Sequence, residues 1–505
     1  MRIAITLALL LAGAALEGDQ AEAEPWLIDL NVVALDSHGR PVNDLTVDDF
    51  QVSDNGKLQK VAFFRHYDSN LLVAPPRGPD EYSNRAAAPI SRATVILLDL
   101  LNEGFGTRGN AENELVRYLG SVEDPSDLYL YFLTLDGKLY PVRGIPSLKP
   151  QSPAAEPWTR GIKQLMDNAL HTVMRVRPAE IDVAVREQLT YAALDNLAVQ
   201  LSRVPGHKNI VWITDGIPVT LGPYRSDTGD YVDFTPQIRQ MSEALDRSGI
   251  AIYPVRQVML GSPTAIGDAS GGGNGGGFTG GSGLGSLDTL DQFAGMTGGR
   301  PDAGKDIGAA IKQAMSDART SYQVAYYPPE RNWDGKFHKI RIVTKRKGVR
   351  LQSKTGYYAW PEPPDTRARE AIDQTAAAPF DATEIGLRVK VSLDTQDRSA
   401  VFLNAHIDAN DIVLLPDGGT YRGQLRVALA TYSADEPPQI SSIMHLDLHY
   451  SSAEIDRILK EGIPFTAKLQ IAENTKTLRV IVFDRGSNTV GSVSVPPRSA
   501  GRGQS

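Results

Sequence analysis

Two aspartates follow short apolar runs that are typical of strands buried on both faces of a parallel sheet. Residues 94–98 (TVILL) precede Asp99, and residues 209–214 (NIVWIT) precede Asp215. In an open parallel sheet, ligands bind beyond the carboxyl ends of the strands, at the point where the strand order reverses. The sequence therefore predicts a binding rim at that edge. Its candidate residues are Asp99, Asn102, Glu103, Thr214 and Asp215.

Metal binding at this rim is one of two alternatives. Asp99 and Asp215 would supply the carboxylates for a hard cation such as Mg²⁺ or Ca²⁺. Asn102 or Glu103 would add a further oxygen, whereas the side chain of Leu101 has none. Any cation would then be held weakly, with more water than protein in its shell. In the other alternative both aspartates cap helix N-termini or accept hydrogen bonds from loop backbone, and no cofactor is required.

The sequence lacks the residues that several classes of enzyme need for catalysis. The chain has no cysteine, which excludes disulfide frameworks, thiol catalysis and zinc or iron–sulfur sites that need thiolates. It has eight histidines but no H-E-x-x-H motif, and no G-x-S-x-G nucleophile elbow follows a strand. The glycine-rich segment 271–285 is not followed by Gly-Lys-Ser/Thr, so we expect a flexible loop there and not a phosphate loop. The sequence favours a protein without catalysis.

A second class stays open, an exported carbohydrate-binding or hydrolytic protein with its site in a β domain. Clustered tyrosines could form a sugar-stacking surface, although at strand spacing such residues more often belong to a core. These tyrosines are Tyr322, Tyr326, Tyr327, Tyr357 and Tyr358. An acidic pair beside a groove lined by them would favour this alternative. The acidic residues of the N-terminal strands are instead expected in turns or on the solvent face: Asp36, Asp48, Asp49 and Asp54.

Charge and the N-terminal segment bound the location and the partners. The chain has 52 Lys and Arg against 60 Asp and Glu, a net charge of −8, which argues against a general affinity for nucleic acid or anionic lipid. Arg2, the apolar residues 3–16 and the AEA sequence at 21–23 predict a signal peptide over residues 1–23. No later run is long enough to span a bilayer. We expect a soluble, secreted or periplasmic protein with a protein partner.

The chain between residues 92 and 318 alternates strand and helix patterns. This alternation predicts an α/β domain with a mostly parallel sheet and helices on both faces. The expected strands are 94–99, 128–135, 209–214 and 250–255, with an edge strand at 138–143. The expected helices are 181–201, 238–247, 287–294 and 307–318.

All-β segments flank this domain. Residues 26–68 and 320–358 each offer too few strands for a core, so we expect them to form one shared β-sandwich. Residues 383–496 have strand-length segments at the spacing of a second sandwich. Residues 71–91 and 361–380 have linker compositions, the latter with one or two helical turns, and 497–505 is expected to be a disordered tail.

A series of short motifs occurs in a fixed order along the chain. GRPV at 39–42 and DF at 49–50 precede LDLLN at 98–102, PGHKN at 205–209, IAIYPV at 250–255, TGG at 297–299, YYP at 326–328, WDGKF at 333–337 and GYY at 356–358. Together they resemble the exported bacterial family of von Willebrand factor A-related proteins, over roughly residues 26–495. The resemblance implies a Rossmann-like A domain at 92–318 and an exported binding role.

The resemblance also implies a metal-ion-dependent adhesion site. That site takes Asp-x-Ser-x-Ser after the first strand, a threonine from a second loop, and an aspartate that often lies in Thr-Asp-Gly. The ITDG sequence at 213–216 matches, but Leu101 and Glu103 occupy the two serine positions, and Thr172 is the candidate threonine. We therefore expect a degenerate site in a protein-binding or adhesion module, an envelope-assembly scaffold that docks through the rim.

Overall fold

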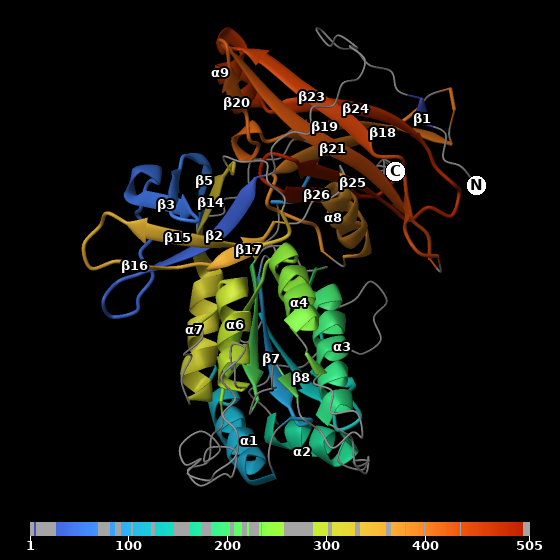
Figure 1. Ribbon diagram of the computed structural model, residues 1–505. Helices are drawn as coiled ribbons and strands as arrows, with labels where there is room; N and C mark the ends of the chain where they lie inside the picture. The colour runs from blue at the N-terminus through green and yellow to red at the C-terminus, as the bar shows by residue number, and fades with distance from the viewer. Residues whose placement is uncertain are drawn as a thin grey trace.

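The structure is a computed structural model. It describes residues 5–6, 27–68, 81–85, 92–102, 105–122, 127–145, 162–173, 183–202, 207–214, 220–221, 232–233, 235–256, 286–300, 306–328, 334–359, 365–378, 380–394, 396–397, 399–434 and 436–497. The predicted signal peptide apart from Ile5–Thr6, the glycine-rich loop, and the predicted tail apart from Pro497 lie outside these residues. The predicted mixed α/β architecture is confirmed, with one α/β layer structure and two groups of β-sheets (Figure 1).

The α/β part is built on a five-stranded sheet of order β13-β10-β7-β8-β9. Its strands are β7 (Arg92–Asp99), β8 (Leu128–Leu133), β9 (Leu139–Arg143), β10 (His207–Ile213) and β13 (Ile250–Val255). The first four of the order are parallel to one another, and β9 adds an antiparallel edge. A separate two-stranded sheet pairs β11 (Thr220–Leu221) with β12 (Val232–Asp233).

Helices cover both faces of this sheet, which explains why its inner strands are mostly apolar. The helices α3 (Val183–Ser202), α4 (Thr235–Arg247) and α6 (Ser286–Thr297) pack with Leu97 and Trp212 in one core. The helices α1 (Phe105–Leu119), α2 (Ile162–Val173) and α7 (Ile307–Arg319) pack with Leu98 and Ile213 in the other. Alternate residues of each strand therefore enter opposite cores, as expected for a sheet buried on both sides.

The N-terminal sandwich takes strands from both ends of the α/β part. One sheet has the order β16-β2-β14-β5, and the other has the order β17-β15-β3-β4. The strands before the α/β part are β2 (Ile28–Leu35), β3 (Phe50–Asp54), β4 (Lys57–Gln59) and β5 (Val61–Asp68), with the 3₁₀ turn η1 (Val47–Asp49). Those after it are β14 (Thr320–Tyr326), β15 (Phe337–Thr344), β16 (Arg350–Gln352) and β17 (Gly356–Tyr358). Buried residues such as Leu30, Val52 and Tyr322 fill the space between the sheets.

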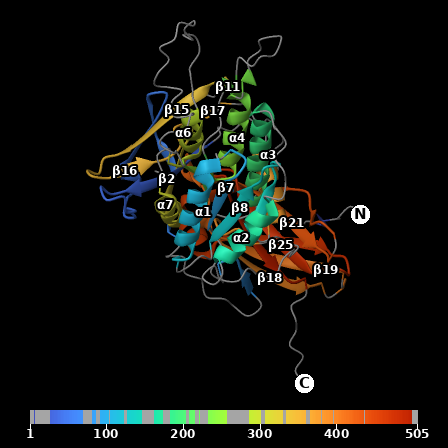
Figure 2. The same ribbon diagram turned by 90° about the horizontal axis from the view of Figure 1, so that it is seen from below.

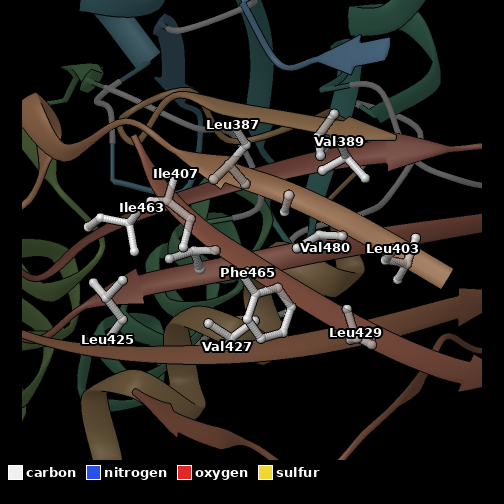
Figure 3. Packing of buried hydrophobic residues seen from close by; sticks show 14 of the residues in the cluster. Leu387, Val389, Leu403, Ile407, Leu425, Val427, Leu429, Ile463, Phe465 and Val480 are labelled. Atoms are coloured by element: carbon white, nitrogen blue, oxygen red, sulfur yellow. The ribbon is translucent and has the colours of Figure 1, made fainter. Parts of the chain in front are cut away.

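The C-terminal sandwich has sheets of order β1-β24-β19-β18-β6 and β20-β21-β25-β26, with β22 and β23 also on β21. Figure 3 shows its core, in which Leu387 and Phe465 from the first sheet meet Leu425 and Val480 from the second. Its elements are β1 (Ile5–Thr6), β18 (Leu387–Leu393), β19 (Ala400–Ile407), η2 (Ala409–Asp411), β20 (Leu415–Asp417), β21 (Thr420–Tyr432), β22 (Gln439–Ile440), β23 (Met444–Ser451), α9 (Ser452–Glu461), β24 (Ile463–Gln470), β25 (Thr477–Asp484) and β26 (Thr489–Val495).

Both segments that we expected to be linkers contribute to this sandwich. Within 71–91, β6 (Glu81–Ser83) pairs with β18. The buried Asn84 side chain then donates to the carbonyls of Ala382 and Ile385, at 2.7 and 2.8 Å, and accepts from the Leu387 N–H at 2.9 Å. Within 361–380, α8 (Thr366–Ala377) runs for twelve residues and buries Ile372 and Ala376 against β21 and β25. A linker composition did not reveal these contacts because they are made with residues far along the chain.

The α/β part meets the sandwiches through the amino ends of its parallel strands. Lys354, between β16 and β17, lies 2.7 Å from Asp246 at the end of α4, and α7 leads directly into β14. The carboxyl ends of the strands therefore lie at the opposite end, toward the lower end of Figure 1, and Figure 2 is seen from that side. Among the described residues, no helix has the length and apolar composition needed to cross a membrane.

Candidate functional site at the carboxyl ends of the parallel strands

The rim is centred on the point where the strand order reverses. From β7 the chain goes to β8 on one side, and it later returns to β10 on the other side of β7. Asp99 ends β7, and Thr214 directly follows β10, whose Ile213 is in register with Leu98. The Thr214 hydroxyl donates to Asp99 Oδ2 at 2.8 Å, so the two residues bridge the reversal point. This is the place where open α/β sheets bind ligands.

Asp99 organises the first loop of the rim. The side chain is fully buried, and its Oδ1 accepts the backbone N–H groups of Leu101 at 3.1 Å and Asn102 at 3.0 Å. Its Oδ2 accepts Asn102 Nδ2 at 2.8 Å and Trp212 Nε1 at 3.1 Å, in addition to the Thr214 hydroxyl. Burial raises the pKa of the Asp99 carboxyl, and the hydrogen bonds from Asn102, Thr214 and Trp212 oppose that rise. Asp99 therefore holds the loop in one conformation.

Asn102 extends the network to the neighbouring helix. Its Nδ2 also donates to the hydroxyl of Thr190 on α3 at 2.8 Å, and Thr190 donates to the Arg186 carbonyl at 2.9 Å. Thr190, and not the candidate Thr172, thus joins Asp99, Asn102 and Thr214 in the network. The hydroxyl of Thr172 donates to the Asn168 carbonyl within α2, on an exposed face.

The described rim residues do not fit a cation bound directly by Asp99. A carboxylate has about four lone-pair directions, and the five donors around Asp99 already occupy them. A cation would have to displace one of these donors inside a site without solvent access. Over the described ranges, moreover, no three His, Asp or Glu side chains lie close enough together to hold a metal ion. Of the two alternatives, the geometry of Asp99 favours the structural anchor.

Glu103 and Asp215, the other predicted acidic residues of the rim, lie outside the described residues. The rest of the predicted set, Asp99, Asn102 and Thr214, is brought together in one hydrogen-bonded network. Trp212 and Thr190 were not predicted as members. Trp212 lies in the apolar run before Asp215 and looks like a core residue. No sequence signal distinguishes Thr190 from other helical threonines.

Glu187 is a further buried carboxyl group beside this network. It lies one turn before Thr190 on α3, is 1% exposed, and neither of its carboxylate oxygens has a hydrogen-bond partner among the described residues. Burial raises the pKa of Glu187 to about 8, a rise that the nearby Arg186 opposes. A buried carboxyl group whose pKa is strongly shifted is often found at functional sites. A glutamate in a helical pattern gave no sign of this burial.

The exposed part of the rim lies around the first turns of α3. Val185 is 46% exposed there, and the turn at residues 134–138 packs against the same helix. A Cβ atom on Gly137, whose φ is +75°, would lie 2.7 Å from Leu189 Cβ, so only glycine allows this close approach. Lys138 in that turn extends into solvent and pairs with Asp136 at 2.7 Å. The surface thus combines an apolar side chain with a charged pair on a rigid base.

Tyr322, Tyr326 and Tyr357 of the tyrosine cluster lie in or against the core of the N-terminal sandwich, as the core alternative expects, and not on a sugar-stacking surface. Tyr322 and Tyr326 are fully buried in the core of the N-terminal sandwich. Asp54, expected on the solvent face, is 4% exposed and accepts the hydroxyls of Tyr326 at 2.9 Å and Tyr357 at 3.0 Å. This expectation for Asp54 was wrong, because its partners come from strands more than 270 residues away. These three tyrosines therefore stabilise the sandwich from within.

No protein-family model matches the chain, and a search of curated proteins finds none with significant sequence similarity.

Proposed function

We propose that the protein is an exported, non-catalytic protein-binding module that docks through the rim of its parallel sheet. The observation that carries the proposal is the network around Asp99, whose hydrogen bonds hold residues 101–102 and Thr214 together at the reversal point. A preformed surface loses little conformational entropy when a partner binds. The site would act as an adhesion or envelope-assembly surface with a degenerate metal-ion-dependent adhesion site.

The position of the rim supports this role. It lies at the end of the α/β part that faces away from both sandwiches, so a large partner can approach without steric conflict (Figure 1). Loops at the carboxyl ends of strands are also where α/β proteins carry their binding residues. The predicted signal peptide, the absence of cysteine and the resemblance to exported von Willebrand factor A-related proteins support a secreted or periplasmic location.

A pair of substitutions on α3 tests the docking surface. Val185 lies at the rim and Val199 near the other end of the same helix, about 21 Å away at 1.5 Å per residue. The two side chains are 46% and 49% exposed, so replacing either with glutamate changes a similar amount of surface. We expect Val185→Glu to reduce capture of the partner from an envelope extract at least about tenfold, because a charge would be buried in the interface.

Val199→Glu is the matched control and should capture as much partner as the wild-type protein. Thermal unfolding of both variants checks that the fold is intact. If Val185→Glu captures the same proteins in the same amounts as Val199→Glu, the partner binds elsewhere and the rim proposal is wrong.

A further inference from the structure

The sheet β17-β15-β3-β4 has one face in the sandwich core and one face directed outward. Its register places Tyr357, His338, Ile340, Val52 and Asp54 on the inner side. The alternate positions therefore share the outer side, and directly opposite pairs such as Phe337 with Tyr358 and Arg341 with Ser53 lie together on it. We call this the outer sheet face and define it by six residues: Ser53, Leu58, Phe337, Lys339, Arg341 and Tyr358.

The outer sheet face is basic in a protein whose net charge is −8. Lys339 and Arg341 are both exposed and lie two residues apart on β15, about 6.8 Å along the strand. Neither has an ion-pair partner among the described residues, and no outward position of these four strands holds Asp or Glu. Lys345 follows on the same side one residue beyond the end of β15. Two unpaired cations without a nearby acid attract an anionic ligand.

An aromatic platform adjoins these cations. The ring of Phe337 lies over Gly356, because a Cβ atom there would be 2.3 Å from Phe337 Cζ. Phe337 meets Tyr358 edge-on with a centroid distance of 5.2 Å, and the guanidinium of Arg239 on α4 lies 4.2 Å from the centroid of Tyr358, so α4 covers the Tyr358 end of the face. Despite these contacts Phe337 stays 40% exposed, and Leu58 across the sheet is 69% exposed. Large apolar side chains held open to solvent beside charges mark a binding surface.

We propose that the outer sheet face binds an acidic polysaccharide. Lys339 and Arg341 would pair with sugar carboxylates or sulfates, and the exposed face of Phe337 would pack against the C–H face of a sugar ring. β15 pairs with β17 over residues 337–339 and with β3 over residues 340–344, and these pairings occupy backbone groups that an added peptide strand would need. Two cations and two apolar side chains are also too few to hold a membrane surface. This face belongs to a different part of the protein from the rim and does not depend on it.

The test measures binding of the full chain to polygalacturonate, with dextran as the neutral polymer. We expect the wild-type protein to bind polygalacturonate and not dextran, with affinity that falls as salt is raised. Lys339→Gln with Arg341→Gln should weaken binding at least about tenfold, because both charge-assisted contacts are lost. The matched control is Lys163→Gln with Lys312→Gln, which removes the same charge from exposed positions on α2 and α7 and should bind as the wild-type protein does.

Phe337→Ala separates a glycan from other acidic ligands. It should weaken polygalacturonate binding several-fold, while the salt dependence stays the same because no charge is removed. Equal binding of polyglutamate that is insensitive to Phe337→Ala would show that the face takes acidic protein segments, and the proposal would be wrong. Binding to anionic phosphatidylglycerol vesicles alone, or to none of these probes, would overturn it as well.

Discussion

At the scale of single residues, Asp99 is the anchor of the rim. Its carboxylate satisfies the N–H groups of Leu101 and Asn102 and the indole N–H of Trp212 inside a site without solvent. Asp99→Ala would leave these donors buried and unpaired, so we expect the free energy of unfolding to fall by about 3 kcal/mol. Urea unfolding should give the same loss in EDTA and in Mg²⁺. A loss seen only when Mg²⁺ is present would instead identify Asp99 as a metal ligand.

Glu187 should make stability depend on pH. Its pKa is about 8 in the folded protein against 4.5 for the ordinary side chain, so the folded state retains a proton that the unfolded state has released between these values. The contribution of Glu187 to the free energy of unfolding is therefore most favourable below about pH 4.5, and it becomes less favourable as the pH rises toward 8. We expect Glu187→Gln to be more stable than the wild-type protein at pH 8 by about 1–3 kcal/mol and similar to it near pH 4.5.

Urea unfolding at the two pH values measures this difference. Glu473→Gln, at an exposed turn position in the C-terminal sandwich, is the control and should not change the pH dependence of unfolding. If Glu187→Gln follows the wild-type pH profile, Glu187 is not held in an environment that favours its protonated form.

The positions of the strand ends at the rim could be predicted from the sequence, whereas the burial of particular polar side chains could not. The strand-then-carboxylate pattern placed Asp99 and Thr214 at neighbouring strand ends, because strand length and apolar composition are local properties. Glu187, Thr190 and the buried state of Asp54 were missed, because each depends on which element packs on it. Asp54, for example, is buried by tyrosines from β14 and β17 that have no local relation to it.

At the scale of elements, β6 is the least expected. It is a three-residue strand inside a segment rich in proline and alanine, and Asn84 secures its end through three hydrogen bonds to residues 382–387. Asn84→Ala would leave two carbonyls and one N–H of this buried turn unpaired. We expect it to reduce the free energy of unfolding by about 2–3 kcal/mol, whereas Asn404→Ala, at an exposed position of the same sheet, should change it by less than about 0.5 kcal/mol.

Urea unfolding of the full chain measures both asparagine variants. Equal effects of the two substitutions would show that the β6 segment is not an integral part of the C-terminal sandwich.

Helix α9, in contrast to β6, has clear signals in the local sequence, although we did not predict a helix there. Ser451 and Glu454 form a capping box at its start, and Gly462 with φ +86° ends it. A Ser-x-x-Glu pair before an apolar stripe and a glycine after it is a recognisable helix signature. The alternating residues on either side concealed it, since they favoured a continuous series of strands. The Asn55-Gly56 turn between β3 and β4 is another local signal of this kind, since both residues have the positive φ that a tight hairpin turn requires.

At the scale of the whole molecule, the chain order interlocks the two sandwiches. It visits the N-terminal sandwich, adds β6 to the C-terminal one, forms the α/β part, and then returns to each sandwich in turn. Arg65 on β5 binds Asp411 of the C-terminal sandwich at 3.0 Å and so joins the two sandwiches directly, while Arg85 after β6 binds the same carboxylate at 2.6 Å from within the C-terminal sandwich. The chain enters and leaves the α/β part on the side that faces the two sandwiches. The rim therefore lies at the end of the α/β part that is farthest from them (Figure 1).

Capture of a partner by the full chain in the presence of EDTA tests most directly whether the hydrogen bonds of Asp99, and not a cation, complete the docking surface at the rim. We expect the wild-type protein and Val199→Glu to capture the same partner equally well in EDTA and in Mg²⁺, and Val185→Glu to fail in both. If capture by the wild-type protein is lost in EDTA and restored by Mg²⁺, a bound cation completes the surface and the proposed role of Asp99 is wrong.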